Sequence, residues 1–173
     1  MRYRTAVIED VDRLVKLYKA VARTKGGIIR LEHEITPEYV RGFCEKSLSN
    51  GLIIVGEHPE DPDELIAEIH AFKHDIEVFE HVLGNLTIVV HPDFQGKKIG
   101  RTILTIFLEE IVRNRPEVGR IELITRESNA SAIKLYQSVG FLIEGRLEMR
   151  VKTADGNYEA DIPMGWQNLN FEF

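Results

Sequence analysis

The sequence contains a single cysteine and no long hydrophobic run, and each of these absences excludes a class of protein. Because Cys44 is the only cysteine in 173 residues, no disulfide can form within the chain. The longest apolar runs, at 52–55 and 87–90, fall far short of the roughly 20 residues that a membrane-spanning helix needs. The first residues also lack the apolar stretch and cleavage site of a signal peptide. We therefore expect a cytoplasmic protein with no membrane partner.

The sequence also lacks an excess of positive charge. Its formal net charge is −6 at pH 7, from 28 acidic and 22 basic residues. Domains that bind nucleic acid are usually basic, so this balance argues against a nucleic-acid partner. An acidic surface would suit a cationic substrate, although the same balance also serves solubility alone. Against this background, Lys97, Lys98 and Arg101 form a local basic cluster that needs an explanation.

Internal repeats, low-complexity segments and linkers between domains are absent as well. The length, with 43% hydrophobic and 29% charged residues, is typical of one globular unit with a core of its own. We therefore predict a single domain that spans residues 1–173.

Hydrophobic spacing predicts a mixture of strands and helices. Apolar and β-branched runs predict strands at 3–8, 51–57, 65–73, 86–91, 120–125, 141–152 and 158–166. Apolar residues that recur every three or four positions predict helices after Asp10, after Thr36, after the loop at 95–98 and after Asn129. We expect Asp10, Thr36 and Asn129 to be N-caps, because a side-chain oxygen there accepts an N–H that the first helical turn leaves free.

Further details of these elements can be predicted. The apolar face of the second helix should consist of Val40, Phe43, Cys44 and Leu48. The segment 24–27 should end the first helix and Gly140 the fourth. Asp155-Gly156 is a strong turn dipeptide that should join the last two strands as a hairpin. The strand–helix–strand order requires parallel neighbours with right-handed crossovers, and ligands of such sheets bind beyond the carboxyl ends of strands.

The segment from Gln95 to Arg101 lies at such a carboxyl end and opens a helix. Free N–H groups and the helix dipole favour an anion there, glycines allow close approach, and the basic side chains add charge. The pattern predicts a phosphate site, although a plain strand-to-helix turn with solvated lysines explains it equally well. A nucleotide P-loop is disfavoured because only three residues separate Gly96 from Gly100, and the three-glycine dinucleotide pattern is absent.

A second segment, ELITRESNASAIKLYQSVGFLIEGR at 122–146, decides between these interpretations. Its Asn-x-x-Ala-x-x-Leu-Tyr run followed by Gly-Phe consists of Asn129, Ala132, Leu135, Tyr136, Gly140 and Phe141. Together with Gln/Arg-x-x-Gly-x-Gly/Ala at 95–100, this resembles the GCN5-related N-acetyltransferase (GNAT) family. The resemblance is close over 84–146 and loose elsewhere, and the final hairpin resembles the subgroup of ribosomal-protein and amino-acid acetyltransferases.

The resemblance implies an α/β GNAT fold: a mixed, mostly antiparallel sheet with splayed central parallel strands, flanked by helices. It implies acetyl-CoA as the acyl donor, with no metal, bound where strands 86–91 and 120–125 separate. The residues implied in binding it are Ile88, Val89, Val90, Gln95, Gly96, Lys97, Lys98, Ile99, Gly100, Arg101 and Asn129. Lys98 replaces a family glycine, and a lysine with positive φ would cost about 1 kcal/mol.

The resemblance further implies an N-acetyltransferase in which a primary amine, of a small molecule or a protein N-terminus, attacks the thioester directly. Tyr136 would be the acid that protonates the leaving thiolate, unless it is only a core aromatic residue. Ile124 stands where some relatives have a glutamate, so the base cannot be transferred directly from the family. Glu122 is the candidate base instead, although it equally fits a solvated strand position. Glu68 and His70 are further candidates for this role.

One alternative remains open. A CoA-binding sensor or scaffold without catalysis would also have the binding loop, and Lys98 and Ile124 are the departures that favour it. Dimers are common in this family, so a homodimer is also an expectation of the resemblance.

Overall fold

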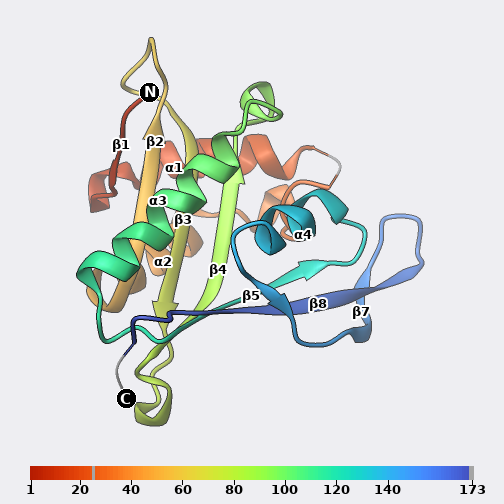
Figure 1. Cartoon of the computed structure of the whole chain (residues 1–173). Coiled ribbons are helices and arrows are strands. Elements are labelled where there is room, and N and C mark those ends of the chain that lie inside the picture. Colours follow the sequence, from red (N-terminus) through yellow and green to blue (C-terminus); the bar gives the residue numbers. More distant parts are fainter. Residues whose placement is uncertain (25, 172–173) are drawn as a thin grey trace.

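The computed structural model describes residues 1–24 and 26–171, which form a mixed sheet with helices on both faces (Figure 1). The strands are β1 Tyr3–Thr5, β2 Gly51–Glu57, β3 Leu65–Lys73, β4 Val82–Val90, β5 Arg120–Arg126, β6 Leu142–Ile143, β7 Leu147–Lys152 and β8 Tyr158–Gln167. The α-helices are α1 Val11–Ala22, α2 Pro37–Asn50, α3 Ile99–Asn114 and α4 Ala130–Gln137. No helix among the described residues is both long enough and apolar enough to cross a membrane.

The sheet has the order β1-β2-β3-β4-β5-β8-β6, with β7 also paired to β8. All of these pairs are antiparallel except β4 with β5, which are parallel. That parallel pair is short, since only Val82 and Leu83 of β4 are opposite Arg120 and Ile121 of β5. Beyond it the strands separate, and Figure 1 shows β5 and β8 turning away from β4. The predicted fold class, including the splayed parallel strands, is confirmed.

A bulge in β4 lies just beyond the paired residues. His70 of β3 is opposite Thr87, whereas Phe72 is opposite Gly84, so β4 has one residue more than β3 over this stretch. Asn85, inside the bulge, has a φ of 56°, in the left-handed region that asparagine tolerates better than most residues. A bulge bends its strand and increases the local twist, which helps to separate the end of β4 from β5.

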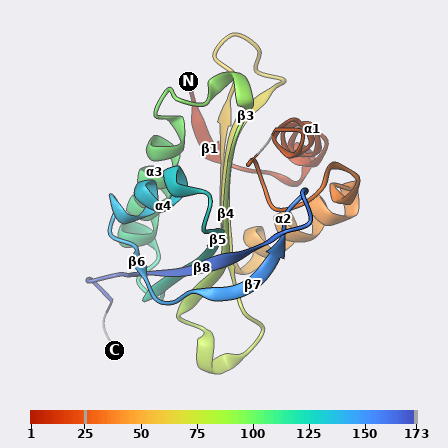
Figure 2. The same ribbon diagram turned by 90° about the vertical axis from the view of Figure 1, so that its right-hand side faces the viewer.

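Two hydrophobic cores fill the space on either side of the sheet. Figure 2 shows α3 and α4 on one face and α1 and α2 on the other. The fully buried Ile103, Leu104 and Phe107 of α3 belong to the first core. Leu14 of α1 and Cys44 of α2 belong to the second. Burial raises the pKa of the Cys44 thiol to about 12, so this side chain packs as a small apolar group.

Most predicted elements are present, with informative differences at their ends. Thr36 caps α2, because its Oγ1 accepts the N–H of Tyr39 at 3.2 Å, and Asn129 caps α4, because its Oδ1 accepts the N–H of Ala132 at 3.3 Å. The hairpin turn at Asp155-Gly156 is confirmed, with a φ of 85° at Gly156. The segment predicted to end α1 includes Lys25, which lies outside the described residues.

The prediction that the Asp10 side chain caps the first helix was wrong. Its side chain makes no capping bond to α1 and instead accepts the N–H of Val7 at 2.9 Å, across the 3-10 turn Ile8–Asp10. The first strand, predicted at 3–8, ends at Thr5. Arg4 donates to both carboxylate oxygens at 2.7 and 2.9 Å, and Arg13 also binds the carboxylate. Asp10 is therefore the buried centre of an ion cluster, which sequence spacing could not reveal.

Other corrections concern the second helix and two strands. Leu48 is exposed and Ser47 is buried in its place, because α2 turns its row at 40, 43 and 47 toward the sheet. The strand predicted at 141–152 is divided into β6 and β7, and the strand predicted at 86–91 begins four residues earlier, at Val82. The Gly84-Asn85 pair, which resembles a turn in sequence, is the bulge within that strand.

The Asp10 cluster generates a stability prediction. Burial disfavours the charged carboxylate, but hydrogen bonds from Arg4 and Val7 and the nearby arginine charges outweigh it, so the pKa of Asp10 is lowered. Removing one partner of a buried ion cluster costs about 3–5 kcal/mol, and we expect Asp10→Asn to lower the free energy of unfolding by that amount at pH 7. Urea denaturation measures this difference.

The pH dependence of this difference has a definite sign. A lowered folded-state pKa contributes stability above the unfolded pKa of about 4, and that contribution is lost as the pH falls through the folded value. The gap between wild type and Asp10→Asn should therefore shrink below about pH 4. The exposed Asp12, on the same helix, provides the control Asp12→Asn, which should change stability by less than about 1 kcal/mol. Equal effects of the two variants would contradict the prediction.

Candidate functional site

A groove of about 490 Å³ opens where β4 and β5 have separated, at the carboxyl end of β4. Its floor is the end of β4, one wall is the loop and first turn of α3, and the other is the start of α4. The predicted residues that line it are Ile88, Val89, Val90, Gln95, Gly96, Lys98, Ile99, Gly100, Arg101 and Asn129. Lys97 lies outside this lining, with its ammonium nitrogen 4.7 Å from the centre of the Phe94 ring.

The loop before α3 presents a row of unused backbone donors. The N–H of Gln95 bonds to the carbonyl of Pro92 at 3.2 Å, and the N–H of Thr102 bonds to the carbonyl of Lys98 at 3.0 Å. Between them, the N–H groups of residues 96–101 donate to no described residue. A helix start with free donors and a positive dipole is a ready-made anion site, and the groove lies against it.

Lys98 has a left-handed backbone in this loop. Its φ of 64° and ψ of 8° make it the N-cap residue of α3, without a side-chain capping bond. The condition stated for this position is therefore met: Lys98 has positive φ, at a cost of the order of 1 kcal/mol. The position lines the groove, so the strained residue adds an ammonium group to the anion site. Arg101 adds a guanidinium, which also donates to Ser138 Oγ at 3.1 Å.

The end of β4 also offers backbone groups toward the gap. The N–H of His91 donates to the carbonyl of Ile66 in β3. Two residues further along the pair, Glu68 is opposite Val89, so the backbone groups of Val89 also bond to β3. Because bonding alternates along an antiparallel pair, the backbone groups of Ile88 and Val90 point toward the separated β5. Gln95 Nε2 already donates to the carbonyl of Val90 at 3.0 Å. The groups left for a ligand are therefore the N–H and carbonyl of Ile88 and the N–H of Val90.

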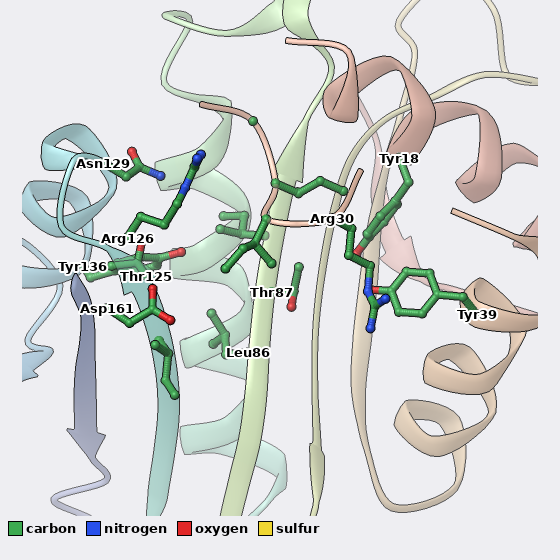
Figure 3. Close-up of a pocket in the computed structure, with 15 residues that line it drawn as sticks. Tyr18, Arg30, Tyr39, Leu86, Thr87, Thr125, Arg126, Asn129, Tyr136 and Asp161 are labelled. Atoms are coloured by element: carbon green, nitrogen blue, oxygen red, sulfur yellow. The ribbon is translucent and has the colours of Figure 1, made fainter. Parts of the chain in front are cut away.

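A smaller cavity of about 150 Å³, which we call the inner pocket, continues from this groove (Figure 3). The two share Gly27, Ile88 and Asn129 as lining residues. Tyr136 of α4 lines the inner pocket and is only 5% exposed. Burial raises the pKa of its phenol well above the ordinary value, and its hydroxyl bonds to no described residue. A protonated phenol with a free hydroxyl is thus available in the inner pocket.

Glu122 lies elsewhere. It lines a third cavity of about 430 Å³, the outer pocket, together with His70, Arg30 and Tyr39, whereas Tyr136 does not line that cavity. Arg120 Nε holds the Glu122 carboxylate at 2.7 Å and also binds Glu144. The structure therefore does not bring the two predicted catalytic residues into one cavity, and Glu122 already has a cationic partner.

The other candidate bases, Glu68 and His70, are joined in a buried cluster. Tyr18 donates its hydroxyl to Glu68 Oε2 at 2.6 Å, and His70 Nδ1 lies 2.8 Å from Glu68 Oε1. All three side chains are at most 3% exposed. The His70 ring stacks on Phe43, with ring centres 4.2 Å apart. Glu68 is thus satisfied within the protein, while Tyr18 lines the inner pocket and His70 the outer one.

Several residues of the inner pocket escaped prediction. Arg30, Tyr39, Thr125, Arg126 and Asp161 line it but belong to no recognisable motif. For Asp161 a signal existed, because an aspartate between the apolar Ala160 and Ile162 interrupts an otherwise core-like strand. Among the residues that the structure describes, no group of three or more histidine, cysteine or carboxylate side chains is arranged to hold a metal ion.

Comparison with known proteins adds independent information. A family model described as "Acetyltransferase (GNAT) family" matches residues 13–141. The [ribosomal protein bS18]-alanine N-acetyltransferase of Escherichia coli (strain K12) is 36% identical over 75 residues, which are 43% of this chain. The match spans only about half of that relative, 49% of its length.

Solved structures share the fold over nearly the whole chain. An acetyltransferase of the GNAT family from Streptococcus pneumoniae superposes with a TM-score of 0.84 at 21% identity, covering 96% of this chain and 98% of the other. A GNAT superfamily phosphinothricin acetyltransferase from Sinorhizobium meliloti, in complex with acetyl-CoA, gives a TM-score of 0.76 at 18% identity, covering 96% and 88%. At these identities, the likeness shows a common fold.

The left-handed backbone at Lys98 generates a testable prediction. Glycine adopts positive φ without strain, whereas alanine keeps the strain of lysine but lacks its charge. We expect Lys98→Gly to be about 1 kcal/mol more stable to urea than Lys98→Ala.

The neighbouring Lys97 provides the control, because its φ is not positive. There the order should reverse, with Lys97→Gly less stable than Lys97→Ala by about 0.4–1 kcal/mol, since glycine loses more chain entropy on folding. If Lys98→Gly is less stable than Lys98→Ala, as at position 97, Lys98 is not strained.

Proposed function

The chain belongs to the acetyltransferase (GNAT) family, and on this basis we propose that it transfers the acetyl group of acetyl-CoA to a primary amine by direct attack. One observation supports this most strongly. The groove beside the free N–H row meets the inner pocket at Ile88 and Asn129, and the free hydroxyl of Tyr136 lies in that pocket. A long anionic donor and a small acceptor could therefore meet beside a proton donor.

The residues of the groove fit a diphosphate with an extended arm. The six N–H groups at 96–101, with Lys98 and Arg101, would hold the anionic part. The free backbone groups of Ile88 and Val90 would bond to an amide-containing arm, as a strand edge bonds to an added strand. Asn129 Oδ1 is used in capping α4, so its amide nitrogen remains to donate to the ligand. Acetyl-CoA has both a diphosphate and such an arm.

The chemistry requires little beyond orientation. The N–H of Ile88 faces the gap and would polarise the thioester carbonyl, which develops negative charge as the amine attacks. Tyr136, which holds its proton because burial raises its pKa, would donate to the sulfur as it leaves. The pKa of a free thiol is about 8.5. In a buried pocket, sulfur therefore leaves less readily as a bare thiolate than as a thiol that receives a proton as it departs.

The acceptor would enter from the outer pocket, which adjoins the inner pocket through Arg30, Tyr39 and Ile124. The name of the Escherichia coli relative gives an alanine of ribosomal protein bS18 as its acceptor, and that of the Sinorhizobium neighbour gives phosphinothricin, so one acceptor belongs to a protein and the other is a small molecule. We propose a primary amine of one of these two kinds for this chain. The exposed Ile124 lines both pockets and supplies no carboxylate between them, and Glu122 of the outer pocket is paired with Arg120.

This function predicts that acetyl-CoA raises the melting temperature of the protein and that thiol is released when a suitable amine is added. Screening amino acids, polyamines and N-terminal peptides with a thiol-reactive dye would identify the acceptor. With that acceptor, Tyr136→Phe should lower kcat at least about 100-fold, because the acid is lost, while leaving acetyl-CoA affinity unchanged.

Tyr158→Phe is the matched control, because Tyr158 lies on β8 and is 55% exposed. It should have wild-type kcat. Calorimetric titration with acetyl-CoA distinguishes the transferase from a non-catalytic CoA sensor. Tight acetyl-CoA binding with no thiol release for any amine of the panel would favour the sensor. Wild-type kcat in Tyr136→Phe would exclude the proposed acid.

A further inference from the structure

We propose that Asp161 binds the acceptor amine as an ammonium ion in the inner pocket and receives its proton. This inference rests on the proposed function and identifies the base that family motifs did not supply. Asp161 lies on β8, where Arg126 of β5 is opposite it on one side and Leu147 of β7 on the other. Because β8 is paired on both edges here, the backbone that positions this carboxylate is fixed.

The carboxylate of Asp161 is buried and half unsatisfied. The residue is 4% exposed and lines the inner pocket, together with Tyr136 and Thr125. Its Oδ2 lies 3.2 Å from Arg150 Nε of β7, whereas Oδ1 is buried with no hydrogen-bond partner. Figure 3 shows Asp161 beside Thr125 and Tyr136, across the pocket from Leu86 and Thr87 of β4. A buried oxygen without a donor is costly, so a ligand in this pocket should supply one.

The surroundings favour a cationic donor of small size. The cavity of about 150 Å³ holds an aminomethyl group but not a large head group. Arg126, which also lines the pocket, lies 3.9 Å from Glu159, so its charge is shared with another carboxylate. Arg150 is the only cation that contacts Asp161 among the described residues, and it contacts Oδ2, so Oδ1 is left without a cationic partner. An ammonium N–H bonded to Oδ1 would complete the pairing of this buried charge.

The proposed reaction uses Asp161 and Tyr136, and it balances in atoms and charge. An acceptor R–NH₃⁺ gives one proton to Oδ1, and its nitrogen then forms a bond to the thioester carbonyl carbon. The carbon–sulfur bond breaks with its electron pair on sulfur, and Tyr136 protonates that sulfur. The nitrogen loses its second proton to the Tyr136 oxygen. The products are the amide, the free thiol and a proton on Asp161, which passes to water.

The other carboxylates near the site are less suited to this role. Glu122 is held by Arg120 and lines the outer pocket only. Glu68 already accepts from Tyr18 and is bonded to His70, so neither of its oxygens is vacant. Asp161 alone among the three lines the same cavity as Tyr136.

The test uses the full chain in two independent measurements. In the first, wild-type protein saturated with free CoA is titrated calorimetrically with n-propylammonium chloride and, separately, with 1-propanol. These probes share size and shape but differ in charge. We expect n-propylammonium to bind at least about tenfold more tightly than 1-propanol, and Asp161→Asn to abolish that preference. Equal binding of the two probes to wild type would overturn the proposal.

The second measurement uses thiol release with the acceptor found by screening. Asp161→Asn should raise KM for the amine and lower kcat, each at least about tenfold, with acetyl-CoA affinity unchanged, because Asp161 does not line the groove. Glu148→Gln is the matched control: it removes the same charge from an exposed position on β7 and should behave as wild type. Kinetic constants within twofold of wild type for Asp161→Asn would refute the role of Asp161 while leaving the transferase function intact. Absence of thiol release by wild type would instead refute the proposed function, and the calorimetric comparison would still test Asp161.

Discussion

The brief parallel contact between β4 and β5 is the constraint on which the rest of the structure depends. Two residue pairs at Val82 and Leu83 hold the strands together, and the bulge at Asn85 then turns β4 away. A sheet that remained paired would bond every backbone group at its centre and leave no cavity. Separation after two pairs exposes the backbone of Ile88 and Val90, and both the groove and the inner pocket lie in the gap. The buried helices on both faces keep the two halves of the sheet in place.

The same gap explains why an acidic chain concentrates positive charge in one loop. The N–H row at 96–101 lies beside the groove, and the positive end of the α3 dipole is at the same place. A residue with positive φ turns the chain into the helix within this row, and glycine would do so without strain. Lysine at this position retains the turn, accepts a strained backbone and places its charge at the groove. Local strain at such a position is consistent with a site kept for binding, not for folding.

The sequence allowed the architecture and the groove to be predicted, but not the interior of the pocket. Periodicity located the helices, and two motifs located Tyr136 and the loop, because both signals are local. The Asp10 cluster and the vacancy at Asp161 depend on partners from distant strands, so spacing along the chain could not reveal them. Glu122 was selected because it is the only carboxylate of β5. Its ion pair with Arg120 and its separate cavity appear only in three dimensions.

The lone cysteine has a practical consequence for studying this chain. Cys44 lies in the second core with no exposed surface, and its thiol has a pKa of about 12. Dyes that react with thiolates should therefore not react with the folded protein, so the colour that develops during turnover would come only from the thiol of released coenzyme A. For the same reason, alkylation of Cys44 would measure local unfolding, because the thiol would react only when α2 separates from the sheet.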